Sequence, residues 1–326
     1  MRADVQAWFA RRTSSVSDWD RDAVMRAKGS TSVSVVLPAR NEERTVGDIV
    51  RCLRRDLVEE LPLVDEVVVI DSGSEDRTGE VARAAGATVH RQRDVHPDLG
   101  DRPGKGEALW KSLFVTTGDV VVFLDADLRS FDPAFAVGLI GPLLSDRRTH
   151  FVKAIYDPPL ADGRTVLPAG GGRVTEILAR PLLNVHFPEL AGIVQPLAGE
   201  YAGRRTLLER LPFVSGYGVE IAMLVDVLHH VGLDGMAQVD LGRRVHRNSP
   251  DDALGRMAGQ VYLAMLSRLA LHDRVLPTVD PRTDLTQFTR DRGSFVPQVS
   301  CVGVDDRPPA ASLPQYGVRP DRVPSP

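Results

Sequence analysis

Two aspartates, Asp125 and Asp127, are the residues best placed to do chemistry, because they directly follow the apolar run 120–124. That run is rich in β-branched residues and predicts a strand with apolar neighbours on both faces. Residues two apart in an extended chain project to the same side, so both carboxylates can face one volume at the strand's carboxyl end, where open α/β sheets bind ligands. Mg²⁺ or Mn²⁺ carrying a diphosphate would relieve their repulsion. The pair indicates a metal and nucleotide site; the alternative is a turn in which either carboxylate caps the next segment.

A second candidate metal ligand lies far along the chain. His246 stands among arginines, after a segment at 236–241 that reads as a strand. Nearby positive charge disfavours the charged form of imidazole, and neutral imidazole is a competent metal ligand. A lone histidine is more often structural or exposed, so this residue by itself is only a candidate.

Two glycine-rich segments could bind phosphate. Glycines flank Lys105 and would let the backbone approach a ligand while the ammonium reaches a phosphate; the alternative is a solvated surface loop. Three glycines at 170–172 precede a helix, whose first amide groups would bind an anion, and Arg173 and Thr175 add a guanidinium and a hydroxyl. The alternative there is a flexible loop with an ordinary helix cap.

Tyr217 and Glu220 form a third candidate set. Glu220 stands just before the apolar helical pattern 221–231, where a carboxylate favours the positive end of the helix dipole for structural reasons alone. The functional interpretation puts Tyr217 and Glu220 in the pocket, in contact with sugar hydroxyls.

The elements that must position these residues alternate between strand and helix. Strands are expected at 33–37, 67–70, 87–90, 120–124 and 150–156, and helices at about 46–57, 76–85 and 108–115. This order predicts the α/β class, with a Rossmann-like, mostly parallel sheet flanked by helices. Residues 1–30 suggest one or two short helices on the outside. The tail from about residue 273 is rich in Pro, Asp and Arg, and we expect it to be irregular and to wrap the domain or remain mobile.

Composition excludes several classes of function. A formal charge of −4 on 326 residues gives no global attraction to nucleic acid or to an anionic membrane. The two cysteines, Cys52 in a predicted helix and Cys301 in a predicted loop, have no metal-ligand spacing and indicate reduced thiols. No apolar run reaches transmembrane length and no signal-peptide pattern opens the chain, so we expect a cytoplasmic protein.

Four segments resemble the GT-A nucleotide-sugar glycosyltransferases: 35–43, 70–74, 102–110 and 123–128. Four later segments, at 170–176, 195–201, 216–220 and 245–248, are similar to the glucosyl-3-phosphoglycerate synthases of actinobacteria, with a shorter echo at 304–309. The resemblance covers residues from about 30 to about 270. It implies the GT-A fold and transfer of glucose from UDP-glucose to the 2-hydroxyl of 3-phosphoglycerate. It also implies retention at the anomeric carbon, a divalent metal (Mg²⁺ or Mn²⁺) and a homodimer.

The resemblance also implies residue roles. The uridine and diphosphate would be lined by Pro38, Ala39, Arg40, Glu42, Ser72, Lys105 and Ala126. Asp125 would bond the donor's ribose or sugar, Asp127 and His246 would hold the metal, and Glu220 would contact the transferred glucose. The acceptor would be bound by Gly172, Arg173, Thr175, Tyr217, Arg244 and Asn248. Arg40 stands where the family has an apolar residue, so its contact is expected through the backbone.

These roles divide the chain into an extension (1–30), a nucleotide-sugar half (31–160), an acceptor half (161–272) and the tail (273–326). Since no nucleophile is evident, a front-side displacement is the working hypothesis, in which the leaving phosphate accepts the acceptor's proton. A metal is expected to contribute several kcal/mol and an exposed Lys105–phosphate pair only up to about 1 kcal/mol.

Three alternatives stay open at this point. Donor choice depends on few contacts, so a mannosyl-3-phosphoglycerate synthase using GDP-mannose fits as well. A sugar-phosphate nucleotidylyltransferase would need a glycine-rich, arginine-containing loop after the first strand, where this chain has residues 38–43. A non-catalytic nucleotide-binding protein would be expected to lack the metal ligands, and Asp127 and His246 are both present.

Overall fold

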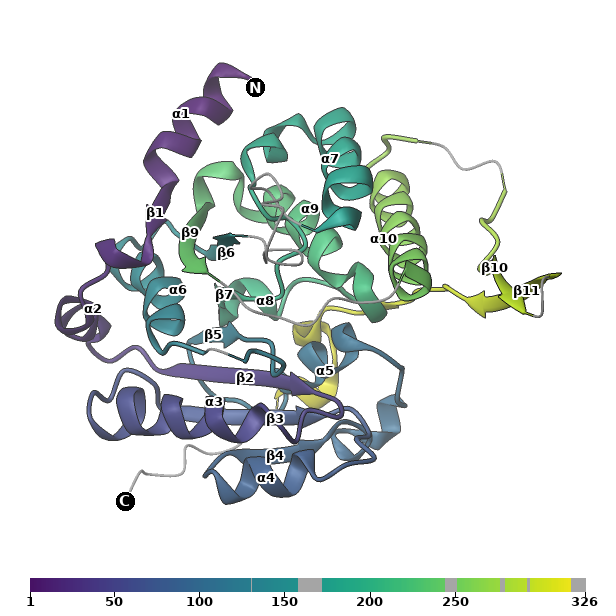
Figure 1. Cartoon of the computed structure of the whole chain (residues 1–326). Coiled ribbons are helices and arrows are strands. Elements are labelled where there is room, and N and C mark those ends of the chain that lie inside the picture. The colour runs from purple at the N-terminus through teal and green to yellow at the C-terminus, as the bar shows by residue number, and fades with distance from the viewer. Residues whose placement is uncertain (130, 158–171, 244–250, 276–278, 292–293, 318–326) are drawn as a thin grey trace, which may run out of the picture.

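The computed structural model describes residues 1–129, 131–157, 172–243, 251–275, 279–291 and 294–317 (Figure 1). Its strands are β1 Thr13–Ser15, β2 Val33–Ala39, β3 Glu66–Asp71, β4 Thr88–Arg91, β5 Val120–Phe123, β6 Phe151–Asp157, β7 Tyr201–Arg204, β8 Phe213–Val214, β9 Met236–Arg243, β10 Asp284–Asp291, β11 Ser294–Cys301 and β12 Asp306–Arg307. Its α-helices are α1 Ala3–Arg12, α2 Arg21–Lys28, α3 Val46–Leu53, α4 Thr78–Ala84, α5 Lys105–Ser112, α6 Ala134–Ser145, α7 Arg180–His186, α8 Arg205–Leu208, α9 Val219–Val231 and α10 Asp251–Leu271.

One sheet organises the described chain. Its eight strands run in the order β1-β9-β6-β7-β5-β2-β3-β4, and every neighbouring pair is parallel except the two that involve β7. The carboxyl ends of the parallel strands therefore lie along one edge. Because β7 runs the other way, its first residue, Tyr201, lies at that same edge, paired with Phe123 at the end of β5. The predicted α/β class and mostly parallel sheet are confirmed.

Helices cover both faces of the sheet, and the alternation of side chains along each strand decides which face a residue joins. On β5, Val120 and Val122 pack in the core under α3 and α6. Val121 and Phe123 pack in the core under α5 and α9. Asp125 continues the second set, so its carboxylate emerges on the side of α5 and α9.

The first 30 residues contribute more than covering helices. They form α1 and α2, as expected, and also β1, which extends the sheet by pairing with β9. The indole of Trp8 on α1 donates a hydrogen bond to the carbonyl oxygen of Met236, which fixes the extension to the start of β9.

The prediction of an irregular tail is wrong for residues 284–291 and 294–301. They form a two-stranded antiparallel hairpin, β10–β11, and Cys301 ends β11 instead of lying in a loop. Figure 1 shows this hairpin standing away from the body beyond α10. After the hairpin the chain does wrap the domain, because β12 pairs with β8. None of the described helices is long and apolar enough to cross a lipid bilayer.

Candidate active site

A buried ion-pair cluster lies at the carboxyl edge of the sheet. The ammonium of Lys105 donates a hydrogen bond of 2.5 Å to Asp125 Oδ1 and lies 3.0 Å from Glu220 Oε1. The three side chains are 16%, 21% and 7% exposed. Three separate elements supply them: the first residue of α5, the end of β5 and the first turn of α9. The structure thus brings together three residues that the sequence placed in different segments.

The electrostatics of this cluster keep Lys105 charged. Burial disfavours the ammonium, but the two carboxylates outweigh it and raise the pKa of Lys105 well above the ordinary lysine value. The expected exposed lysine–phosphate pair is therefore wrong as a description of Lys105 in this structure. A ligand phosphate that engages Lys105 must compete with two carboxylates in a partly dehydrated site, where charge interactions are stronger than at a surface.

The two glycines beside Lys105 have a different use from the one expected. Helix α5 begins at Lys105 itself, not at Ala108, and Gly104 caps it with φ 105°. A Cβ on Gly104 would lie 2.5 Å from the Cα of Gly216, and one on Gly106 would overlap the Val214 carbonyl. The glycines therefore allow backbone contact between the start of α5 and the loop before Glu220, and this contact sets Lys105 beside Glu220.

The side chain of Asp125 packs closely against the backbone of Gly199. A Cβ on Gly199 would lie within 2.5 Å of the Asp125 carboxyl carbon, so only glycine leaves room for that side chain. Gly199 belongs to the segment 195–201, which the sequence singled out without giving it a role. In the structure, Gly199 of this segment packs against the Lys105–Asp125–Glu220 cluster. Lys105 Nζ also donates a hydrogen bond of 3.5 Å to the Gly199 carbonyl oxygen.

Two residues beside the cluster, Lys153 and Tyr201, were given no role in the sequence analysis. Lys153 on β6 is fully buried, donates a 2.5 Å hydrogen bond to the Ala198 carbonyl and lies 4.6 Å from the centre of the Tyr201 ring. Burial lowers the pKa of Lys153 to about 7; the charge of Glu220 opposes this shift and that of Lys105 adds to it. Lys153 lies inside an apolar run, so the sequence signal was a lone charge in a predicted strand.

Hydrogen bonds between two loops fix the region predicted to bind uridine. Asn41, with φ 59°, receives a Glu75 N–H on its side-chain oxygen, and its own N–H donates to Ser74. This cross-links the loop after β2 to the loop after β3. Pro38 and Ala39 end β2, Arg40 is exposed, and Ser72 follows β3, where its hydroxyl donates to Gln92 at 2.9 Å. The structure brings these predicted residues to one edge.

The carboxylates beyond β5 fit a hard divalent cation. Burial, and then the negative charge of Asp127, raise the pKa of Glu42. The hydroxyl of Thr45 donates to the Ala126 carbonyl at 2.7 Å and fixes the turn that carries Asp127. Such crowding of negative charge is what a cation relieves, and oxygen donors are what Mg²⁺ and Mn²⁺ prefer. Within the described ranges no three His, Cys, Asp or Glu side chains form a ligand cluster, so a ligand diphosphate or other residues must complete the shell.

The second predicted metal ligand and part of the acceptor site fall outside the described residues. His246, Arg244 and Asn248 follow β9, whose carboxyl end lies at the same sheet edge as Asp125. That placement agrees with a shared site, and the ligand role of His246 stays a prediction.

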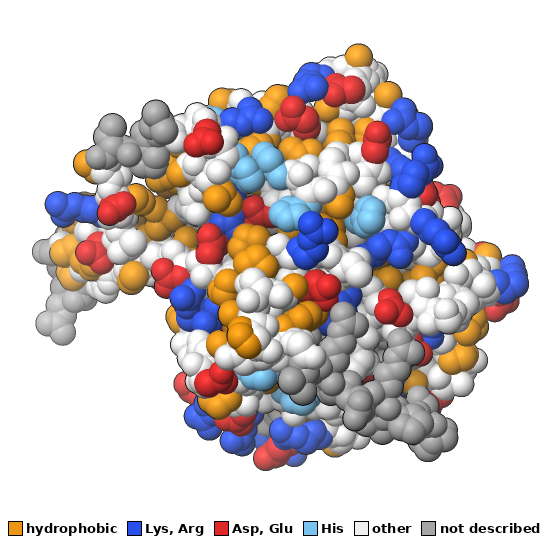
Figure 2. All heavy atoms as spheres, turned by 180° about the vertical axis from the view of Figure 1, so that it is seen from behind, with side chains coloured by type: hydrophobic (Ala, Val, Ile, Leu, Met, Phe, Trp, Pro, Cys, Tyr) orange, Lys and Arg blue, Asp and Glu red, His pale blue; other side chains and the backbone are white. Residues whose placement is uncertain are grey.

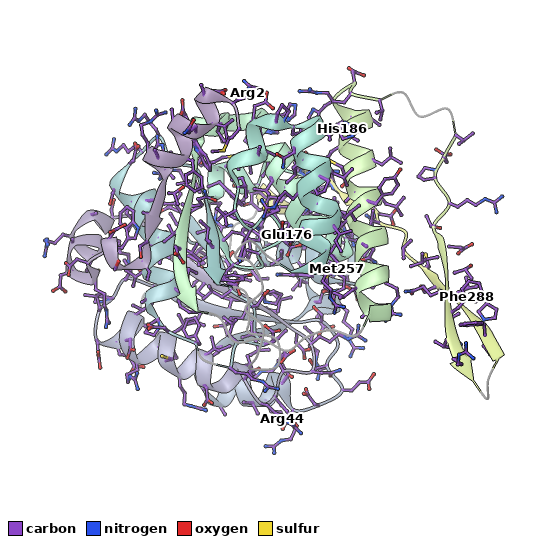
Figure 3. The ribbon with its side chains drawn as sticks, turned by 45° about the horizontal axis from the view of Figure 1, so that its top comes forward. Arg2, Arg44, Glu176, His186, Met257 and Phe288 are labelled. Atoms are coloured by element: carbon purple, nitrogen blue, oxygen red, sulfur yellow. The ribbon has the colours of Figure 1, made fainter. Side chains whose placement is uncertain are left out.

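The described acceptor candidates lie on two elements. Gly172 and Arg173 are exposed, and Thr175 is buried at the first residue of a π-helical turn that leads into α7. Tyr217, 53% exposed, lies in the turn before α9, where its backbone N–H donates to Gln260 of α10. Figure 3 labels Glu176 on the π-helical turn and Met257 on α10, two elements that contact each other.

Comparison with known proteins decides the family. The sequence profile of glycosyl transferase family 2 matches residues 34–169. A glucosyl-3-phosphoglycerate synthase from Mycolicibacterium smegmatis is 46% identical over 306 residues, which cover 94% of this chain and 98% of that protein. The chain belongs to the glucosyl-3-phosphoglycerate synthase family. It is therefore a glycosyltransferase, and the predicted resemblance is confirmed.

Crystal structures of similar proteins agree with the fold. Glucosyl-3-phosphoglycerate synthase from Mycobacterium tuberculosis, in complex with Mn²⁺, UDP and glucosyl-3-phosphoglycerate, is 44% identical with a TM-score of 0.79 over 90% of this chain and 96% of that one. Mannosyl-3-phosphoglycerate synthase from Rubrobacter xylanophilus is 39% identical with a TM-score of 0.88 over 94% of this chain and 99% of that one.

Proposed function

We propose that this member of the family transfers glucose from UDP-glucose to the 2-hydroxyl of 3-phosphoglycerate, with retention and with Mg²⁺ or Mn²⁺. The observation that carries the proposal is similarity over nearly the whole chain to an enzyme whose crystal structure holds Mn²⁺, UDP and glucosyl-3-phosphoglycerate. The buried Lys105–Asp125–Glu220 cluster supports it, because it lies at the sheet edge where such folds bind nucleotides.

The donor would occupy the edge formed by β2, β3 and β5. Pro38, Ala39, the Arg40 backbone, Glu42, Ser72 and Ala126 would line the nucleotide. Asp125 would bond the ribose or the sugar, and Asp127 with His246 would hold the cation. When bound, that cation supplies Lewis-acid stabilisation of the charge that develops on the diphosphate.

The acceptor would lie on the side of α7 and α9. Its phosphate and carboxylate suit Gly172, Arg173 and Thr175 at the start of the helical segment, with Tyr217, Arg244 and Asn248 completing the site. Glu220, which lies 3.0 Å from Lys105, would bond hydroxyls of the transferred glucose.

In the proposed transfer step no protein side chain acts as a nucleophile. The acceptor 2-oxygen forms a bond to the anomeric carbon, the bond from that carbon to the diphosphate oxygen breaks, and the acceptor proton passes to the departing phosphate. Lys105, charged and freed from one of its carboxylates, would offset the negative charge of the leaving group. Glu220 would orient the sugar for attack on the face that the diphosphate leaves.

A second donor is the main competing function. The similarity to a mannosyl-3-phosphoglycerate synthase, at a TM-score of 0.88, favours GDP-mannose as a second candidate. Equal concentrations of UDP-glucose and GDP-mannose, supplied together with Mg²⁺ and 3-phosphoglycerate, would settle donor choice. We expect UDP to exceed GDP among the released nucleotides. GDP in excess would replace the proposal by its competitor, and neither nucleotide would overturn both. A nucleotidylyltransferase would instead release pyrophosphate from UTP and a sugar phosphate.

We also propose a homodimer in which the β10–β11 hairpin contacts the second copy. Its two strands pair only with each other among the described strands. The hairpin projects beyond α10, which β10 contacts, as Figures 1 and 3 show, and Figure 3 labels Phe288 on it. Phe288, Phe295 and Val299 are 65%, 68% and 67% exposed, and Figure 2 shows apolar atoms along this projection. Serine at the two phenylalanines should convert a dimer to a monomer in light scattering, whereas Val185→Ser, on exposed α7, should not. A wild-type monomer would refute this.

The cytoplasm is the proposed compartment. Cys52 and Cys301 are both unpaired thiols, as expected of a protein kept in a reducing environment.

A further inference from the structure

The hydroxyl of Tyr201 is a buried polar group with no hydrogen-bond partner among the described residues. Its side chain is fully buried, at the first residue of β7. Buried hydroxyls are nearly always satisfied, and one left unpaired costs stability. A group of this kind is retained where another state of the protein satisfies it.

The ring of Tyr201 has one fixed position. Phe123 and Phe151, on the neighbouring strands, contact it with ring centres 5.1 and 5.5 Å away, and the Lys153 ammonium lies 4.6 Å from its centre. Tyr201 is the register partner of both Phe123 and Lys153. The hydroxyl can therefore rotate about its C–O bond, but the ring cannot carry it elsewhere.

Tyr201 belongs to the same side of the sheet as the Lys105–Asp125–Glu220 cluster. Tyr201 packs on the same side of the sheet as Phe123, two residues before Asp125, and in the same core as the first turns of α9. Burial, followed by the negative charge of Glu220, raises the pKa of Tyr201 well above its ordinary value, and Lys105 acts in the opposite direction. The phenol therefore keeps its proton and can donate a hydrogen bond.

We propose that Tyr201 is a positioning residue for glucose transfer: its hydroxyl donates a hydrogen bond to Glu220 once Lys105 turns from that carboxylate to the diphosphate of the donor. In the ligand-free arrangement Lys105 lies 3.0 Å from Glu220 and holds it. When the donor engages Lys105, the carboxylate would lose that partner at the moment when it must hold the sugar. Tyr201 supplies a replacement, and this inference rests on the proposed function.

The test compares two Tyr→Phe variants. Tyr201→Phe removes a hydroxyl without a described partner, so its thermal midpoint should equal or exceed that of the wild type. Its kcat with UDP-glucose should fall at least tenfold, while the KM for UDP-glucose changes less than twofold. Tyr316→Phe is the matched control: that hydroxyl donates to Glu209 at 2.9 Å, remote from the cluster. The control should lower the midpoint by about 2 °C and leave kcat unchanged.

A double-mutant cycle adds a second readout. Glu220→Ala and Tyr201→Phe should be less than additive in kcat, because each removes one partner of the same hydrogen bond. Wild-type kcat in Tyr201→Phe, or additive losses in the double variant, would overturn the inference and leave the proposed function standing. An inactive wild type would overturn both.

Discussion

The substitution Gly199→Ala tests whether the close contact between Gly199 and Asp125 sets the position of the Asp125 carboxylate. The added Cβ would lie 2.5 Å from the Asp125 carboxyl carbon. Since ordinary carbon–carbon contacts are about 3.5–4.0 Å, the carboxylate must withdraw by about 1 Å. That shift breaks the 2.5 Å bond to Lys105 or moves Lys105 with it. Misplacement of a reacting group by about 1 Å costs about 100-fold in rate, so we expect Gly199→Ala to lower kcat/KM for UDP-glucose about 100-fold.

The assay for this variant measures UDP release under saturating 3-phosphoglycerate, together with urea unfolding. Overpacking of this kind costs about 1–3 kcal/mol of stability, which leaves the protein folded at 25 °C. Gly317→Ala is the control, because a Cβ there meets nothing within 4 Å. A Gly199→Ala enzyme within threefold of the wild type would refute the claim that this contact sets Asp125. A variant that is unfolded in water would refute the stability estimate.

Three further predictions concern charged side chains. Arg307→Met should lower the free energy of unfolding in urea by about 3–5 kcal/mol, because Arg307 donates hydrogen bonds of 2.6 and 2.5 Å to the fully buried carboxylate of Glu107. Adding Glu107→Gln to that variant should recover part of the loss. Burial lowers the pKa of His272 from 6.5 to about 4, so the unfolded chain binds more protons between those values, and stability falls as pH drops through that range. The loss by pH 5 should be about 2 kcal/mol in the wild type and absent in His272→Phe; equal pH slopes would contradict it. Lys105→Met should lower kcat/KM about 100- to 1,000-fold, and a loss below threefold would show that the ammonium is not needed.

Sequence patterns sufficed for six of the eight strands of the sheet, all but β1 and the antiparallel β7, and for the edge at which the site lies. Alternating strands and helices predicted a mostly parallel sheet, and the position of Asp125 just after the expected strand 120–124 predicted that its carboxylate lies at the carboxyl end of that strand. These features are local, so periodicity and strand ends predict them well. The partnership of Lys105, Asp125 and Glu220 was expected only through the family resemblance, because three-dimensional contact between distant segments leaves no local pattern.

The misses have physical causes. The predicted start of α5 lies three residues too late, because the glycines that flank Lys105 favour a loop. In the structure Gly104 caps the helix and Gly106 packs against the backbone of Val214. The composition of the tail favours irregular structure, but β10 and β11 pair with each other and need little core. Lys153 was missed because a lysine in an apolar run shows no function until its neighbours are known, and Tyr201 because the segment 195–201 carried a family resemblance without a role for any residue in it.

The division of the chain at residues 160 and 272 stays a prediction. Strand β5 pairs with β7 and β6 with β9, so one sheet runs through both proposed halves. The tail is also tied to the site region, because Ser215, just before the turn that holds Tyr217, exchanges hydrogen bonds with Asp305. This contact gives the segment 304–309, which resembled the family without an assigned role, a structural use.

UDP formation from UDP-glucose, followed with and without 3-phosphoglycerate and after removal of divalent cations with a chelator, tests the central claim most directly. The account predicts release of UDP only in the complete mixture, loss of the reaction on chelation and its return with added Mg²⁺. It also predicts that Asp127→Asn abolishes the reaction while the variant stays folded. Release of UDP at the same rate without the acceptor, or a rate unaffected by chelation, would contradict it.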